Sequence, residues 1–184
     1  EFDSLSDRLY RVVRQAAREE SKQVSLDIIG GQTEMDRSII DRIAASFEHL
    51  LRNAVVHGIE SAQQRTQMGK DPVGHINIHL RQEGGDVIIS VRDDGRGLDL
   101  QGIRDKATAK NLLQTGSTVS DEEAAQLIFL SGISTAGTIT PLAGRGVGLD
   151  VVRTEINALG GRIELQNHPH AGAEFTLVLT RTTA

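Results

Sequence analysis

The sequence predicts an α+β fold, a two-layer α/β sandwich in which helices lie on one face of a mixed, largely antiparallel sheet. Three observations support this fold class. Apolar residues recur at helical spacing in several segments, and apolar and polar residues alternate in short runs between them, as they do in strands. Most of these runs lie in adjacent pairs, which favours hairpins over the strand–helix–strand repeat of a parallel sheet.

The first half of the chain is expected to contain two helices, a strand and a hairpin. Asp36 can cap the second helix, and Gly58 is a plausible stop. A polar stretch at 63–72 follows, to which we assign no helix or strand. Glu83-Gly84-Gly85 separates two alternating runs and predicts a hairpin turn. The expected elements are a helix over 5–17, a strand over 24–28, a helix over 36–58 and a hairpin over 76–91.

The second half is expected to add three helices and another antiparallel pair of strands. A stretch at 131–145 is rich in glycine, serine and threonine, and such a composition is typical of a mobile lid. The expected elements are helices over 100–113, 120–130 and 147–159 and strands over 162–166 and 174–179.

Length and composition indicate a single domain over 1–184. The chain has 184 residues, of which 38% are hydrophobic, enough for a substantial core. It carries 25 acidic and 20 basic residues, a net charge of −5, with no basic run, so nucleic acid is not an expected partner. It has no cysteine and no apolar run near the roughly 18 residues of a membrane span. We therefore expect a soluble, cytoplasmic protein without membrane insertion.

A polar stripe lies beside the apolar stripe of the helix over 36–58. His49, Asn53 and His57 are four residues apart, so they lie on one helix face, offset by about 40° at each step. An amide oxygen such as that of Asn53 is a suitable ligand for Mg²⁺, which keeps water and phosphate oxygens in its shell. His49 could take a proton or orient a group near a γ-phosphate, and Arg52 could neutralise phosphate charge. The alternative is a solvated helix face.

A second motif, Asp93-x-Gly95-x-Gly97, lies where a predicted strand ends. A buried carboxylate at Asp93 can accept a hydrogen bond from the exocyclic amine of adenine. Guanine has no such donor there and would leave the acid unpaired, so the residue would favour ATP over GTP. The alternative is an ordinary Asp-Gly turn.

A third motif consists of Gly144, Gly146 and Gly148, which open a predicted helix. Unpaired backbone amides and the helix dipole favour anions at such a position. A dinucleotide-binding fingerprint would require a preceding strand and a parallel βαβ unit, whereas here a lid precedes and antiparallel strands follow. The chain also lacks a Gly-Lys-Ser/Thr phosphate loop. The common nucleotide-binding folds therefore fit poorly.

These motifs, in this order, resemble the GHKL (Bergerat) ATP-binding superfamily and, within it, the catalytic domain of CheA-class chemotaxis histidine kinases. The resemblance covers most of the chain. It implies that Asn53 binds Mg²⁺, that His49 assists catalysis and that Asp93 binds adenine. The matching stretches are the N-box at 49–60, the G1 box at 93–97, the F-box at 129–135 and the G2 box at 144–152.

Motifs and resemblance together define the expected nucleotide site. The cofactors are ATP and Mg²⁺, and the lid over 131–145 is an ATP lid. The expected catalytic residues are His49 and Asn53, with Asn53 as the metal ligand. The expected nucleotide-binding residues are Arg52, Asn53, His57, Asp93, Gly95, Gly97, Lys106, Ser134, Thr135, Gly144, Gly146, Val147, Gly148 and Leu149.

The resemblance also implies partners. The γ-phosphate of ATP would pass to a histidine on a separate histidine phosphotransfer domain, and a response regulator would act downstream. The segment 1–20 resembles the helix that connects this domain to a preceding dimerisation domain, and an adaptor-binding domain belongs to the same full-length kinase. His75, His79, His168 and His170 are interpreted as surface or packing residues rather than phosphate acceptors.

Some residues depart from the family pattern. The lid reads Ser131-Gly132-Ile133-Ser134-Thr135 where the family has Pro-Gly-Phe-Ser-Thr, which removes an aromatic side chain, and Ala173 replaces a residue that often has a hydroxyl group. Gly69-Lys70 and the segment 99–113 are most similar to the branch that serves type IV pili. Two other interpretations stay open: a GHKL ATPase that performs conformational work, in which glutamate would act as the base, and a non-catalytic nucleotide-sensing module.

Overall fold

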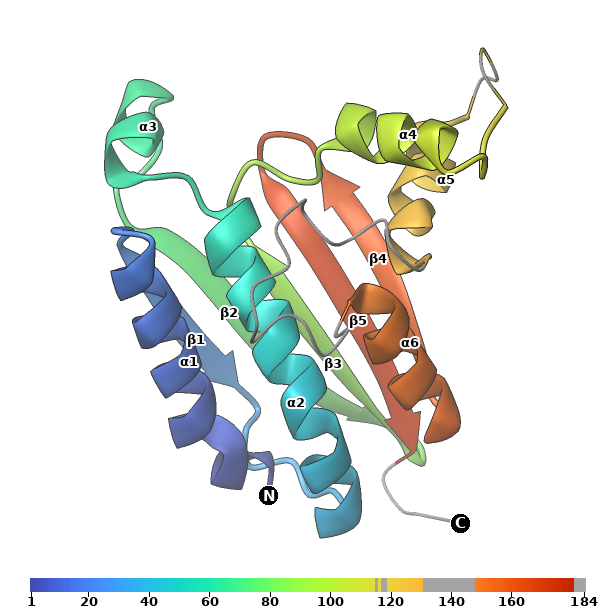
Figure 1. The fold of residues 1–184 in the computed structure, drawn as a ribbon. Coiled ribbons are helices and arrows are strands. Elements are labelled where there is room, and N and C mark those ends of the chain that lie inside the picture. The colour runs from blue at the N-terminus through green and yellow to red at the C-terminus, as the bar shows by residue number, and fades with distance from the viewer. Residues whose placement is uncertain (115, 117–118, 131–147, 181–184) are drawn as a thin grey trace.

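The computed structural model of the chain describes residues 1–114, 116, 119–130 and 148–180. Five strands form one sheet in the order β1-β2-β3-β5-β4 (Figure 1). β1 and β2 are parallel, and the three other neighbouring pairs are antiparallel. The mixed, largely antiparallel sheet is therefore confirmed. The strands are β1 (Val24–Ile29), β2 (Gly74–Glu83), β3 (Asp86–Asp93), β4 (Arg162–His168) and β5 (Gly172–Thr180).

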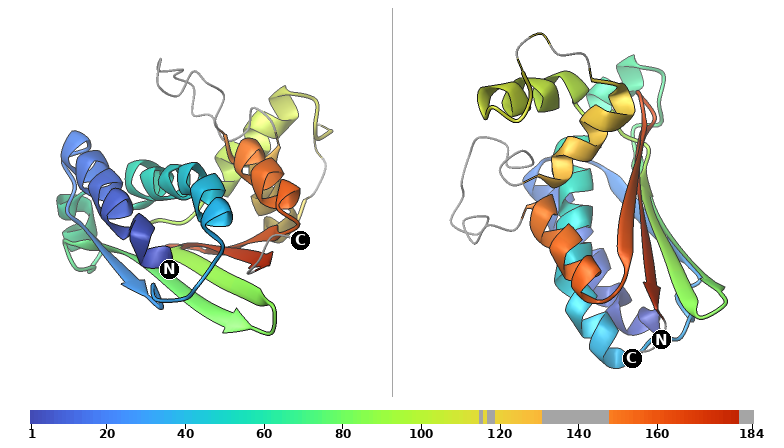
Figure 2. Two further views of the ribbon diagram at one scale, coloured as in Figure 1. Left: turned by 90° about the horizontal axis from the view of Figure 1, so that it is seen from below. Right: turned by 90° about the vertical axis from the view of Figure 1, so that its right-hand side faces the viewer.

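Three helices cover one face of this sheet, and no described helix covers the other face (Figure 2). They are α1 (Ser6–Glu19), α2 (Arg37–Asn53) and α6 (Leu149–Ala158). Two further helices, α4 (Leu100–Ala109) and α5 (Asp121–Gln126), lie near the end of the sheet where β3 stops (Figure 1). This arrangement confirms the predicted two-layer sandwich. The lid predicted over 131–145 lies outside the described residues.

The core lies between the helical layer and the inner face of the sheet. Apolar residues spaced along α1, α2 and α6 meet alternate residues of β2 and β3, which is the pattern that the sequence predicts. The short 3₁₀ helix η1 (Phe2–Leu5) adds Phe2, which was not expected in the core. Phe2 and Phe47 are both 0% exposed, and their rings meet edge to face with centroids 5.5 Å apart. The first turn of the chain is thus part of the packing.

The helix that carries the polar stripe ends as predicted at Gly58, but in an unexpected form. After Asn53 the chain continues as a π-helical turn, η2 (Ala54–Gly58), closed by a hydrogen bond of 2.8 Å from Ile59 N to Ala54 O. Such turns are rare and recur at functional sites. The turn carries His57, so this residue is not on a regular continuation of α2.

The polar stretch at 63–72 contains a short helix, α3 (Ala62–Gln67), which the sequence analysis did not assign. It has a capping box in which Ser61 Oγ accepts a hydrogen bond from Gln64 N at 3.2 Å, while Gln64 Oε1 accepts one from Ser61 N at 3.3 Å. Its buried residue is Arg65 rather than an apolar residue. An amphipathic pattern is therefore missing, and the helix is short of the length at which periodicity is informative.

The remaining segments follow the predicted order with small differences at their ends. The segment 120–130 divides into α5 and a 3₁₀ turn, η3 (Leu127–Phe129), and the turn between β2 and β3 includes Gly84 at a φ of +60°. None of the helices in the described ranges combines the length and the apolar character that crossing a bilayer demands.

The contact between Phe2 and Phe47 gives a stability prediction. Truncation by Phe2→Ala leaves a cavity against α2, and such changes usually cost about 3–5 kcal/mol. We expect a loss of that size in the free energy of unfolding, measured by urea denaturation. Tyr10→Ala, at an aromatic residue that is 37% exposed, is the control and should cost less than about 1 kcal/mol. Equal losses in both variants would contradict the assignment of Phe2 to the core.

Candidate functional site

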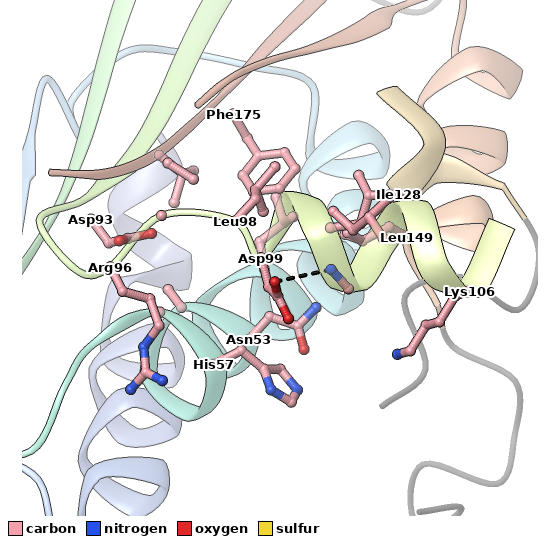
Figure 3. Close-up of a pocket in the computed structure, with 18 residues that line it drawn as sticks. Asn53, His57, Asp93, Arg96, Leu98, Asp99, Lys106, Ile128, Leu149 and Phe175 are labelled. Carbon is pink, nitrogen blue, oxygen red and sulfur yellow. Dashed lines mark hydrogen bonds between the residues drawn. The ribbon is translucent and has the colours of Figure 1, made fainter. Parts of the chain in front are cut away.

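A cavity of about 330 Å³ opens between the end of α2, the turn after β3, α4 and β5 (Figure 3). Its walls are mainly apolar, and a few polar side chains reach into it, which is the usual composition of a small-molecule site. Asp93 and Lys106 lie at opposite ends of the cavity in Figure 3. It is lined by Leu50, Asn53, Ala54, His57, Gly58, Val91, Asp93, Arg96, Gly97, Leu98, Asp99, Gly102, Ile103, Lys106, Ile128, Leu149, Ala173 and Phe175.

The structure brings together residues that the sequence motifs singled out from distant segments. Those that line the cavity are Asn53, His57, Asp93, Gly97, Lys106 and Leu149. Four others, His49, Arg52, Gly95 and Gly148, are described but are not part of its lining. The predicted site residues Ser134, Thr135, Gly144, Gly146 and Val147 lie outside the described residues.

Asp93 is the most buried acid at the cavity, with 7% of its surface exposed. Its Oδ1 accepts a hydrogen bond of 2.9 Å from Gly95 N, and the backbone of Ala173 donates another. Burial nevertheless outweighs these hydrogen bonds and raises the pKa of Asp93 to about 6. The carboxyl group is thus held in place by backbone donors within an apolar wall.

Three glycines allow close backbone contacts around Asp93, two of them with Asp93 itself and one between the neighbouring turns. A Cβ atom on Gly172, at a φ of +99°, would collide with the carbonyl oxygen of Asp93, and one on Gly95 would collide with the carbonyl oxygen of Gly58. A Cβ on Gly58 would lie 3.3 Å from Asp93 Oδ1. Gly58 was expected only as a helix stop. The structure shows that it also leaves room for the acid of the second motif.

Asn53 and His49 are joined by a side-chain contact on consecutive turns of α2. Asn53 Nδ2 lies 3.1 Å from His49 Nε2. If the amide donates to this nitrogen, the ring is neutral with its proton on Nδ1, and the amide oxygen of Asn53 remains as an acceptor beside the cavity. His49 does not itself line the cavity, and it can affect the cavity through its contact with Asn53.

Both histidines of the polar stripe favour the neutral form. Burial and, secondarily, the charge of His57 lower the pKa of His49, against the opposing effect of Asp150. Burial, followed by the charge of Lys22, also lowers the pKa of His57. At neutral pH these rings can therefore accept protons or hydrogen bonds.

Arg52, predicted to bind phosphate, lies outside the cavity lining and points to α1, where its Nη2 lies 2.8 Å from Glu19 Oε2. Two residues that the motifs did not single out, Arg96 and Asp99, add polar groups to the lining. Arg96 lines the cavity beside His57, and Asp99 lines it while accepting a hydrogen bond of 3.0 Å from Gly102 N at the start of α4. Arg96 is the second x of the motif Asp93-x-Gly95-x-Gly97. Its place within this glycine turn was the only feature of the sequence that could have indicated a role in the site.

The apolar wall opposite α2 suits a flat ring. Leu98, Ile128 and Phe175 form it, and Phe175 packs edge to face against Phe129 with a centroid distance of 6.2 Å. Arg153 of α6 lies over the other ring, 5.5 Å from the Phe129 centroid. The cavity thus offers one buried acid beside an aromatic and aliphatic surface.

Comparison with known proteins gives relatives across nearly the whole chain. The family model described as histidine kinase-, DNA gyrase B-, and HSP90-like ATPase matches residues 39–183. Chemotaxis protein CheA of Rhizobium meliloti is 41% identical over 177 residues, which are 96% of this chain and 23% of the relative. Chemotaxis protein CheA of Klebsiella aerogenes is 42% identical over 177 residues, again 96% of this chain and 27% of the relative. The chain spans about a quarter of the length of these curated relatives.

A solved structure gives the same fold at low sequence identity. The histidine kinase AdeS of Acinetobacter baumannii superimposes with a TM-score of 0.56 and 17% identity, over 98% of this chain and 65% of that one. This similarity confirms the fold class.

The raised pKa of Asp93 predicts a pH-dependent stability. The usual pKa of 3.8 rises to about 6 in the folded state, so the folded protein holds a proton here that the unfolded chain has released. Stability from this group is therefore present at acidic pH and is lost as the pH rises through about 6. Relative to Asp93→Asn, the unfolding free energy should fall by up to about 3 kcal/mol between about pH 4 and pH 7.

Urea denaturation at a series of pH values measures this difference. The control is Asp41→Asn at an exposed acid of α2, whose difference from the wild type should change by less than about 0.5 kcal/mol over the same range. A flat difference for Asp93→Asn would mean that the carboxyl group is not buried as described.

Proposed function

Because this chain belongs to the family of histidine kinase-, DNA gyrase B-, and HSP90-like ATPases, we propose that its cavity binds ATP with adenine at Asp93. The observation that carries this proposal is the buried carboxyl group, held by Gly95 and Ala173 at the end of an apolar cavity. It can accept the exocyclic amine of adenine, while Leu98 and Phe175 contact the ring. Guanine would leave the buried acid without a donor.

The phosphates of ATP are assigned to the part of the cavity between Asn53 and Lys106. The positive charges of Lys106 and Arg96 suit a polyanion, and both residues line the cavity. No group of three or more histidine, cysteine or acidic side chains with metal-ligand geometry exists among residues 1–114, 116, 119–130 and 148–180. The donor set instead fits Mg²⁺ that is held by the Asn53 amide oxygen together with phosphate oxygens and water. When bound, the ion would neutralise charge on the phosphates.

The reaction that this arrangement supports best is phosphoryl transfer to a histidine, as in a CheA-like histidine kinase. The bond between the γ-phosphorus and the β,γ-bridging oxygen breaks, and a bond to an imidazole nitrogen of the acceptor forms. Such transfer depends mainly on positioning and charge neutralisation. His49, neutral and joined to Asn53 through Nε2, is assigned the role of orienting the amide, and it accepts a proton beside the reacting groups when Nε2 is released from this contact.

The acceptor and the regulatory partners belong to other domains in this proposal. The CheA relatives are about four times longer than the matched segment, which leaves room for phosphotransfer, dimerisation and adaptor-binding domains in a full-length kinase, with a response regulator downstream. Residues 1–184 would form one catalytic domain, with 1–20 as the connecting helix. We place the protein in the cytoplasm. The narrower assignment to the type IV pilus branch stays a prediction, based on Gly69-Lys70 and the segment 99–113.

The role of Asn53 is tested by nucleotide binding. Asn53→Ala removes the amide oxygen, so we expect ATP binding in calorimetry to lose its dependence on Mg²⁺, while Mg²⁺-free ATP still binds. Asn77→Ala, at an exposed asparagine on β2, is the matched control and should bind Mg·ATP as the wild type does. An Asn53→Ala variant with an unchanged Mg²⁺ effect would rule out this residue as the ligand.

Phosphotransfer tests the reaction itself. Radiolabelled ATP is incubated with the full-length kinase and its histidine phosphotransfer domain, and label on that domain is measured against released phosphate. His49→Ala should lower the transfer rate by at least about 100-fold with little change in ATP affinity. His79→Ala, at an exposed histidine of β2, is the control. Steady phosphate release without transfer would favour a conformational ATPase, and ATP binding with neither activity would favour a sensing module.

A further inference from the structure

Behind the turn that carries Asp93 lies a partly buried cluster of four charged residues, Glu60, Arg65, Lys70 and Asp94, which we call the Arg65 cluster. The side chains of Glu60 and Arg65 are only 4% and 2% exposed, whereas those of Lys70 and Asp94 are 20% and 41% exposed. Two acids and two bases balance in charge. None of these residues lines the ATP cavity, so the proposed chemistry does not account for them.

The two cations of the cluster donate to the backbone of the turn. Lys70 Nζ lies 3.2 Å from Asp94 O and 3.0 Å from Gly95 O, and its third contact is Glu60 Oε2 at 2.7 Å. Arg65 Nη1 contacts Asp94 O at 3.2 Å. The two carbonyl groups that follow Asp93 are thereby fixed by ammonium and guanidinium donors.

The side chains of the cluster fix one another and anchor the turn to the sheet. Arg65 Nη1 lies 3.0 Å from Glu60 Oε1, and Arg65 Nη2 lies 3.1 Å from Asp94 Oδ2. The other oxygen of Asp94 accepts a hydrogen bond of 2.8 Å from His75 N at the start of β2. Arg65 Nε donates a hydrogen bond of 2.6 Å to Asp71 O. A network in which nearly every donor is used has one preferred geometry.

From these contacts we infer that Lys70 and Arg65, with Glu60 as their shared counter-ion, are positioning residues for adenine recognition and act through Asp93. The inference rests on the proposed function of the cavity. The peptide group between Asp94 and Gly95 connects the two sites, because its carbonyl oxygen, Asp94 O, accepts from Lys70 and Arg65 while its N–H, on Gly95, donates to Asp93 Oδ1. The orientation of this peptide, which the two cations fix, therefore sets the direction in which the carboxyl group of Asp93 points.

The energetic cost of the cluster is consistent with a positioning role. Burying ion pairs costs desolvation free energy that their attraction rarely exceeds, so stability alone is a weak reason for such a group. Despite burial, the hydrogen bond and charge of Lys70 and the charge of Arg65 lower the pKa of Glu60, so this acid stays ionised at neutral pH. A carboxyl group that is fixed before the ligand arrives saves the ordering cost at binding.

The experiment compares two nucleotides that differ only in the adenine amine. Calorimetry on the 184-residue chain measures binding of Mg·ATP and of Mg·purine ribonucleoside triphosphate, which lacks that amine. The variant is Lys70→Met, because Lys70 is less buried than Arg65. We expect its affinity for ATP to fall by roughly 10-fold and its affinity for the analogue by less than about 2-fold. Equal losses for both nucleotides would overturn the inference.

A double-mutant cycle with Asp93→Asn separates positioning from a general effect on the fold. If Lys70 acts through the Asp93 carboxyl group, Lys70→Met should have little further effect on ATP affinity in the Asp93→Asn background. The same loss factor in both backgrounds would overturn the inference. Lys70→Arg keeps the charge and should restore part of the selectivity for ATP; no restoration would count against charge-dependent positioning.

Two controls keep the outcome clear. Arg81→Met breaks an exposed ion pair with Glu83 on the β2–β3 hairpin and should leave both affinities unchanged. If Lys70→Met does not fold, Lys70→Gln replaces it. The same selective loss of ATP affinity is expected, and equal losses for both nucleotides would again overturn the inference.

A folded wild-type chain that fails to bind ATP would overturn the proposed function. A wild type that selects ATP over the analogue, with Lys70→Met equally selective, would overturn only the positioning role.

Discussion

The site depends on a close contact between two turns that are distant in sequence. Gly58, at the end of η2, accepts a hydrogen bond of 2.9 Å from Arg96 N in the turn after β3. Because Gly95 has no side chain, the two backbones can meet at this point. The contact brings the polar stripe of α2 and the acid at the end of β3 to one cavity. A larger residue in either turn would move the two motifs apart.

Asp93 and the Arg65 cluster show two different ways of burying charge. Asp93 is alone among apolar neighbours and backbone donors, so burial determines its protonation. Glu60 is equally buried, yet two cations keep it ionised. The turn that follows β3 lies between the two acids, and of the two only Asp93 lines the cavity. A buried acid without a cationic partner can still accept a hydrogen bond from a ligand, whereas the oxygens of a paired acid already accept from protein donors.

The sequence predicted the parts of the site that follow from local spacing. His49, Asn53 and His57 repeat at a helical interval, and Asp93 precedes a glycine turn, so both motifs could be recognised without a fold. The burial of Phe2 and Arg65 could not be predicted, because Phe2 packs on Phe47 and Arg65 pairs with Asp94, and both partners are distant in the chain. Arg52 shows the same limit, since its partner Glu19 belongs to another helix. Sequence periodicity indicates which face of a helix is apolar, but it does not indicate which charged residues form ion pairs with one another.

The attachment of α1 to α2 has a mechanical consequence. Arg8 pairs with Glu48, Arg52 pairs with Glu19, and Lys22 Nζ donates to Val55 O and Val56 O at 2.8 and 3.0 Å. Leu9, Val13 and Ala16 fill the space between these polar contacts. Apolar packing and polar contacts thus join α1 to α2 from Arg8 to the turn that follows α1. We therefore expect a displacement of α1 to be transmitted to α2, which would move Asn53 and His57 relative to the strand that holds Asp93.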